Sequence, residues 1–218
     1  MLDRVAQLHA PFVDAVVVIA SRDSRAAIDA WAAVRGAIVA EQASPTGMLD
    51  AILRAAPALA RQTPDIVWIT WVDQVGVMPA TLERLADAER DSPAPAMIVP
   101  TVRRADPYIH FSRDGDGRIL RLLQRREGDA MPAEGESDLG VFSLTRETFE
   151  RDLQQFARST TAGAATGERN FLPFIPWLAQ RGHVVATIPC TDPREAIGIN
   201  TPGDLRTVEA WLRERAKT

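Results

Sequence analysis

Short apolar runs rich in β-branched residues alternate with helical segments along the first half of this 218-residue chain. The alternation predicts strands at 16–19, 37–40, 66–70 and 97–99, with helices at 24–34, 46–60 and 79–90. Such a βαβαβαβ order favours a doubly wound α/β fold, in which a mainly parallel sheet carries helices on both faces.

The second half of the chain has a different pattern, with more turn residues and shorter apolar runs. It predicts a hairpin formed by 108–111 and 118–124, a strand at 139–144, a helix capped by Thr145, a helix at 171–180, a strand at 184–188 and a last helix that begins at Thr201-Pro202. Leu205, Val208 and Leu212 of the last helix are expected to face inward. Because 91–95 is a loop rather than a linker, we expect a single domain, 1–218, with a β-rich insertion at about 103–145.

The overall composition excludes several classes of function. The net charge is −4 and no basic block stands out, so neither nucleic-acid binding nor binding to an anionic membrane is indicated. Cys190 is the only cysteine, which rules out an internal disulfide and suits a reducing compartment, so we expect a cytoplasmic protein. Lys217 is the only lysine, so any cationic role at a site must fall to arginine.

Two polar residues stand where a doubly wound sheet places its ligands. Asp73 follows the carboxyl end of the expected strand 66–70, and ligands of open α/β sheets bind at such ends. A carboxylate there can hold Mg²⁺, which in turn bridges phosphate oxygens. Asn200 follows an apolar stretch and precedes a helix, so its side-chain oxygen is a second candidate ligand. A turn cap at Asp73 and a helix start at Asn200 are the alternatives.

A third segment lies between the expected strand 37–40 and the following helix. Gln42 has an amide that can donate and accept at once, as recognition of a base edge requires. Thr46 is a plausible N-cap, and Gly47 leaves room for a ligand near the first helical turn. An ordinary loop is the alternative.

Together, the three segments resemble the catalytic domain of N-acetylglucosamine-1-phosphate uridylyltransferase and related sugar-nucleotide pyrophosphorylases. The resemblance runs from about residue 1 to 212 and implies a Rossmann-like nucleotidyltransferase fold with a small β-rich acceptor subdomain. The resemblance also implies which positions read the base and which bind the metal ion. The metal-binding positions are implied to be the catalytic ones as well. The implied nucleotide-binding residues are Gln42, Pro45, Thr46, Gly47 and Asp73, and the implied Mg²⁺ ligands are Asp73 and Asn200.

The acceptor side resembles the family less closely. Gln124 stands where the family usually has glutamate, and in Asp138-Leu139-Gly140 an aspartate replaces the substrate-binding asparagine. Arg125 and Arg126 are candidates for holding an acceptor phosphate, with a solvated pair as the alternative. The implied acceptor-binding residues are Tyr108, Gln124, Arg126, Asp138 and Gly140.

The resemblance implies a reaction in which a phosphorylated acceptor, such as a sugar 1-phosphate, attacks the α-phosphate of a nucleoside triphosphate and releases pyrophosphate. Two other functions remain open: a catalytically impaired relative that binds nucleotide or sugar phosphate or serves as a partner subunit, and a metal-dependent glycosyltransferase. The latter would usually present Asp-x-Asp, whereas Trp71-Val72-Asp73 offers one carboxylate. Whether the chain forms a homo-oligomer is also open.

The family's opening strand and Gly-rich phosphate loop, Leu-Ala-Ala-Gly-x-Gly-Thr-Arg-Met, have no match in this sequence. Residues 1–5 resemble the helix that follows that loop, so the match begins about one βα unit late. Either the start was placed at an internal methionine or the protein is short. In the second case the sheet lacks a central strand, and 16–20 would need another partner.

Overall fold

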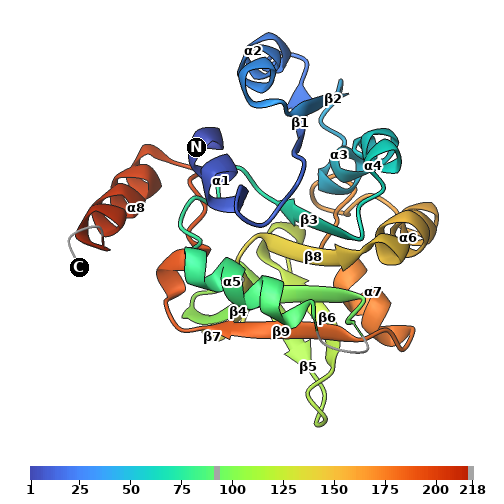
Figure 1. Cartoon of the computed structure of the whole chain (residues 1–218). Helices are drawn as coiled ribbons and strands as arrows, with labels where there is room; N and C mark the ends of the chain where they lie inside the picture. Colours follow the sequence, from blue (N-terminus) through green and yellow to red (C-terminus); the bar gives the residue numbers. More distant parts are fainter. Residues whose placement is uncertain (91–93, 216–218) are drawn as a thin grey trace.

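The computed structural model describes residues 1–90 and 94–215, and its strands form three groups (Figure 1). The first group is a parallel pair, β1 (Val17–Ser21) with β2 (Ile38–Gln42). The second is a five-stranded sheet in the order β3 (Ile66–Thr70), β8 (Val141–Thr145), β4 (Met97–Ala105) and β7 (Glu134–Asp138), with β9 (Val185–Cys190) also paired to β4. The third is the hairpin of β5 (Ile109–Arg113) and β6 (Ile119–Gln124).

The α/β class is confirmed, and the larger sheet is mixed in its strand directions. β9 runs parallel to β4, whereas β8 is antiparallel to both β3 and β4, and β7 is antiparallel to β4. β7 was not anticipated, because its sequence Glu-Gly-Glu-Ser-Asp carries no apolar signal. β7 forms by pairing with Thr101–Ala105, the second half of β4. β4 extends to Ala105, beyond the apolar run from which that strand was predicted.

Eight α-helices and three shorter helical segments surround the strands in the described part of the chain. They are α1 (Leu2–His9), α2 (Arg25–Arg35), α3 (Met48–Arg54), α4 (Ala56–Gln62), α5 (Pro79–Ala88), α6 (Leu153–Ser159), α7 (Phe174–Gln180), α8 (Pro202–Arg215), the 3₁₀ turns η1 (Arg125–Glu127) and η3 (Pro193–Ala196), and the π-helical segment η2 (Thr148–Asp152).

Two details of the expected helices were wrong. The helix predicted at 46–60 is divided at Ala55 into α3 and α4, because Pro57 has no N–H to continue the helical hydrogen bonds. Leu205 is 41% exposed rather than inward, and Trp211 joins Val208 on the buried side of α8. The predicted loop 91–95 lies partly outside the described residues, since 91–93 are not described.

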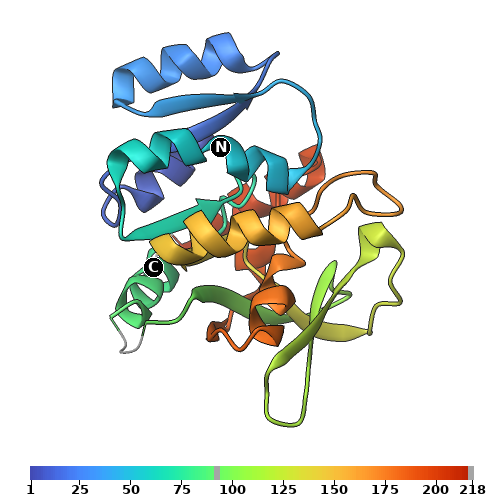
Figure 2. The ribbon, with the colours of Figure 1, turned by 90° about the vertical axis from the view of Figure 1, so that its right-hand side faces the viewer.

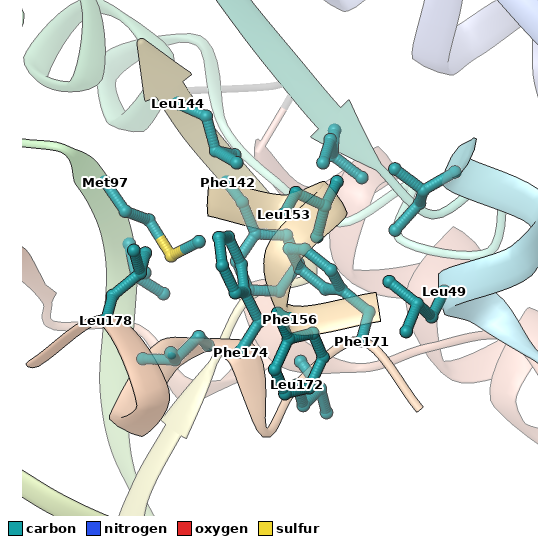
Figure 3. Packing of buried hydrophobic residues seen from close by; sticks show 14 of the residues in the cluster. Leu49, Met97, Phe142, Leu144, Leu153, Phe156, Phe171, Leu172, Phe174 and Leu178 are labelled. Carbon is teal, nitrogen blue, oxygen red and sulfur yellow. The ribbon is translucent and has the colours of Figure 1, made fainter. Parts of the chain in front are cut away.

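The larger sheet is packed on both faces. Met97 and Val99 of β4 belong to a cluster rich in phenylalanine, in which Phe142 of β8 contacts Phe171 edge to face at 5.2 Å between ring centroids (Figure 3). Ile98, whose side chain points the other way, packs on the α5 side. Because both faces are buried, the sheet is a rigid support for the loops that follow its strands. No described helix is long and apolar enough to cross a membrane.

Candidate functional site

A cavity of about 960 Å³ opens beside the carboxyl end of β3 and continues into the interior. One end is polar and the other is apolar. The polar end is lined by Asp73, Gln74, Arg104, Tyr108, Gln124, Arg126, Ser137, Asp138, Asn170, Gly198, Asn200 and Asp204. Both expected metal ligands therefore lie on one cavity, together with four of the five expected acceptor residues.

Gly198 brings Asp73 and Asn200 together. A Cβ built on this glycine would lie 3.0 Å from Oδ2 of Asp73 and 3.4 Å from Nδ2 of Asn200, so the two side chains flank the same point. The backbone N–H of Ile199 donates to the carbonyl of Asp73 at 3.1 Å and fastens one loop to the other. The absence of a side chain at Gly198 is therefore what allows a carboxylate and an amide to approach from two different segments.

The carboxylates of the polar end are partly desolvated. Burial raises the pKa of Asp73. Burial also raises the pKa of Asp138 to about 6, and the nearby charge of Asp73 acts in the same direction, opposed by the N–H of Gly140, which donates to Oδ1 of Asp138 at 2.8 Å. Two carboxyl groups that are poorly hydrated and near each other favour a proton or a cation between them.

Gly140 itself supports the site without lining the cavity. Its φ is +70°, and a Cβ there would come within 2.7 Å of the Gln74 and Trp71 side chains. The glycine thus leaves space for Gln74, whose Oε1 is buried and has no hydrogen-bond partner among the residues that the structure describes. Gln74 was not a sequence candidate, although it directly follows Asp73 in the chain. Arg104, also missed, lies beyond the apolar part of β4 from which that strand was predicted.

The acceptor-side residues come from the hairpin and the segments around it. Asn170 donates through Nδ2 to Oε1 of the buried Gln124. Arg126 lines the cavity, and its Nη2 forms an ion pair with Oε2 of Glu168 at 3.6 Å, a distance longer than a hydrogen bond. Arg125 instead pairs with Asp106 and does not line the cavity. The two neighbouring arginines are therefore distinguished by position.

The expected base-reading segment does not line this cavity. Nε2 of Gln42 donates to the carbonyl of Gly47 at 3.0 Å and to Oγ1 of Thr46 at 3.3 Å, so its donor is used within the loop. Gly47 has φ +116°, and the backbone of Arg169 occupies the position that a Cβ would take. Thr46 accepts from the N–H of Arg169 at 2.8 Å. Pro45 is likewise absent from the lining, so the base-reading role of all four residues stays a prediction.

An α/β fold with a polar cavity at the carboxyl end of β3 is typical of domains that bind nucleotides. Residues 1–137 match the family model of the MobA-like NTP transferase domain. Since this match covers more than half of the chain, the protein belongs to that family.

The chain is also similar to larger curated proteins. It is 29% identical over 182 residues to the bifunctional protein GlmU of Pelotomaculum thermopropionicum, covering 81% of this chain and 38% of that protein. It is 29% identical over 188 residues to GlmU of Roseobacter denitrificans, covering 84% and 39%. The chain therefore corresponds to about two fifths of the length of these relatives.

Solved structures support the fold. A nucleoside-diphosphate-sugar pyrophosphorylase from Vibrio cholerae superposes with a TM-score of 0.63 at 13% identity, over 94% of this chain and 84% of that one. A CMP:2-keto-3-deoxy-manno-octonic acid synthetase, solved in complex with CTP, superposes with a TM-score of 0.63 at 16% identity, over 98% and 88%. At these identities the likeness establishes architecture alone.

Proposed function

We propose that this chain binds a nucleoside triphosphate with Mg²⁺ and transfers the nucleoside monophosphate to a phosphorylated small molecule, such as a sugar 1-phosphate. The observation that carries the proposal is the convergence of Asp73 and Asn200 on Gly198 at the polar end of the cavity. Their carboxylate and amide oxygens are of the kind that Mg²⁺ prefers, and Asp138 lies close enough to add negative charge.

In this proposal, Asp73 and Asn200 would hold Mg²⁺, which would neutralise and orient the phosphates. An oxygen of the acceptor phosphate forms a bond to the α-phosphorus, the bond from that phosphorus to the bridging oxygen breaks, and pyrophosphate leaves. The acceptor phosphate is already ionised, so no side chain has to remove a proton. Arg126 and Arg104 are the cations that line the cavity in the described residues, and we assign Arg126 to the acceptor phosphate.

The remaining acceptor-side residues would orient the acceptor. Tyr108 is half-exposed at the cavity rim, where its hydroxyl can reach a polar ligand. The Asp138 carboxyl has a pKa of about 6, so that near neutral pH it accepts hydrogen bonds and in mild acid it can also donate one.

A thermal-shift measurement tests the binding step. The Tm of the chain is measured with each common nucleoside triphosphate, once in Mg²⁺ and once in EDTA. The same measurements are made on the variant Asp73→Asn and on the control Asp116→Asn, which changes an exposed residue of the β5–β6 turn. A triphosphate present at about 100 times its Kd should raise Tm by roughly 5–10 °C for a protein of this size. We expect the shift to need Mg²⁺, to be lost in Asp73→Asn and to persist in Asp116→Asn.

Release of pyrophosphate in the presence of sugar 1-phosphates tests the transfer step. Stabilisation together with pyrophosphate release supports the transferase, whereas stabilisation without release by any acceptor supports a relative that only binds. If no triphosphate stabilises the protein in Mg²⁺, the proposed site is wrong.

A further inference from the structure

The loop between α6 and α7 lies against the turn that carries Arg126. Figure 2 shows residues 160–170, in orange, beside the 3₁₀ turn η1, in yellow-green. Residues 160–167 of this loop are only threonine, alanine and glycine, so no large apolar side chain can anchor them in the core. Polar contacts therefore have to hold the loop in place.

The carboxylate of Glu127 contacts three residues of this loop. Its Oε1 accepts a hydrogen bond from Oγ1 of Thr166 at 2.6 Å, and its Oε2 accepts one from the backbone N–H of Ala165 at 3.2 Å. A Cβ on Gly163 would lie 2.4 Å from Oε1, so only glycine lets the loop approach the carboxylate this closely. These hydrogen bonds, above all that of Thr166, lower the pKa of Glu127, so its side chain is ionised near neutral pH.

The part of the loop that Glu127 contacts is linked internally. The N–H of Gly163 donates to the carbonyl of Glu168 at 2.8 Å, and the N–H of Gly167 donates to the carbonyl of Gly163 at 2.9 Å. The N–H of Glu168 also donates to Oγ1 of Thr166 at 3.2 Å. Holding Thr166 in place therefore also fixes Glu168, whose carboxylate forms the ion pair with Arg126.

Arg126 lies between two residues that this loop and its continuation hold. Gln124, two positions earlier, accepts a hydrogen bond from Nδ2 of Asn170, and Glu127, the next residue, accepts from Thr166. Fixing the backbone on both sides of Arg126 restricts the positions that its guanidinium can reach. Arg126 lines the polar end of the cavity, so this restriction acts on a residue of the candidate site.

The far end of the loop is anchored without Glu127. The backbone N–H of Arg169 donates to the carbonyl of Thr46 at 2.8 Å, and its carbonyl accepts from the N–H of Leu49 at 3.1 Å. Its guanidinium also pairs with Asp50. A substitution at Glu127 should therefore release the loop next to η1 and leave the contacts of Arg169, and with them the fold, intact.

We propose that Glu127 is a positioning residue for the phosphorylated acceptor: it holds the loop against η1 and so keeps Arg126 directed at the polar end of the cavity. This inference rests on the proposed function, which assigns Arg126 to the acceptor phosphate. Glu127 itself is outside the cavity lining formed by the described residues, so it acts through Arg126 rather than by touching the acceptor. A cation that is already in position loses less conformational freedom when its ligand binds, which strengthens binding.

Amide hydrogen exchange without any ligand tests the anchoring step. Glu127→Ala removes both hydrogen-bond acceptors, Glu127→Gln keeps one carbonyl oxygen, and the matched control Glu150→Ala changes an exposed glutamate of η2. In Glu127→Ala the amides of 163–168 should exchange about tenfold faster or more, with a smaller increase in Glu127→Gln and none in the control. Unchanged exchange in Glu127→Ala would overturn the inference, whatever the protein binds.

Steady-state kinetics test the positioning step, with the sugar 1-phosphate that the parent protein turns over fastest in a panel of such acceptors. Glu127→Ala should raise the KM for this acceptor by about three- to tenfold and leave the KM for the triphosphate unchanged. In the background of Arg126→Ala the same substitution should have no further effect, because Glu127 acts through that guanidinium.

The kinetic outcomes separate the inference from the proposed function. No rise in the acceptor KM, or an equal rise with and without Arg126, would overturn the inference and leave the proposed function standing. If the parent protein releases no pyrophosphate with any sugar 1-phosphate of the panel, the transfer reaction is wrong for this chain, and the role of Glu127 in it is wrong as well.

Discussion

Asp138→Asn should stabilise the protein at neutral pH, because the folded structure disfavours the charge of this carboxyl. Its pKa rises from the ordinary value of 3.8 to about 6 on folding. Between these two pH values the folded state therefore binds more protons than the unfolded state, so stability falls as the pH increases across that window. At 1.36 kcal/mol per pKa unit, the loss above pH 6 amounts to at most about 3 kcal/mol.

Asparagine removes this charge and keeps the oxygen that accepts the N–H of Gly140. Urea unfolding in EDTA should therefore show Asp138→Asn more stable than the parent by up to about 3 kcal/mol at pH 7.5. The difference should shrink toward zero near pH 3.5, where both states of the parent carry a protonated carboxyl. Asp116→Asn serves as the control and should change little at either pH. A gain of the same size at both pH values, or a loss at pH 7.5, would refute the reasoning.

Two further substitutions test the polar end of the cavity. Gly198→Ala places a methyl group 3.0 Å from Oδ2 of Asp73, so we expect a small change in Tm but about a tenfold weaker affinity for Mg²⁺–triphosphate by calorimetry; unchanged affinity would contradict the role of this approach. Arg126→Ala should raise the KM for the phosphorylated acceptor by about tenfold or more with a smaller change in kcat, as expected for one lost charged contact. Arg125→Ala, which removes the partner of Asp106 outside the cavity, should leave this KM unchanged. An equal rise in KM for both variants would count against the assignment of Arg126 to the acceptor phosphate.

The elements that the sequence predicts well are those whose signal is local. Apolar runs and helical periodicity locate β1, β3, α2 and α5 to within a residue or two. The division of the helix at Pro57 was missed although proline is a local signal, because the apolar spacing continues through it. β7 has no apolar run of its own, so its existence depends on a partner far away in the chain.

Strand order is less accessible, because it depends on contacts between distant segments. β8 inserts antiparallel between β3 and β4, and the register that sets Ile98 opposite Ser143 cannot be read from either segment alone. The same holds for the site. Position after a strand identifies Asp73 and Asn200, but only the folded loops reveal that Gly198 lies between them. Gln42 was predicted to read a base from its residue type and its position after a strand. In the structure its amide instead donates to the carbonyl of Gly47 in the same loop.

In the proposed function, the charge of the polar end gives a reason for a nucleotide and a metal ion to bind there together. Asp73, Asp138 and Asp204 line the cavity, against Arg104 and Arg126 as its cations within the described residues. Burial lowers the pKa of His9, which also lines the cavity, so this ring adds no positive charge near neutral pH. A triphosphate alone would therefore meet a surplus of like charge, which a divalent cation between phosphates and carboxylates converts into attraction. Arg104 and Arg126 supply part of the positive charge, and in the proposed function a divalent cation from the solution would supply the rest. The carboxylates that would repel the nucleotide are the groups that would hold this cation.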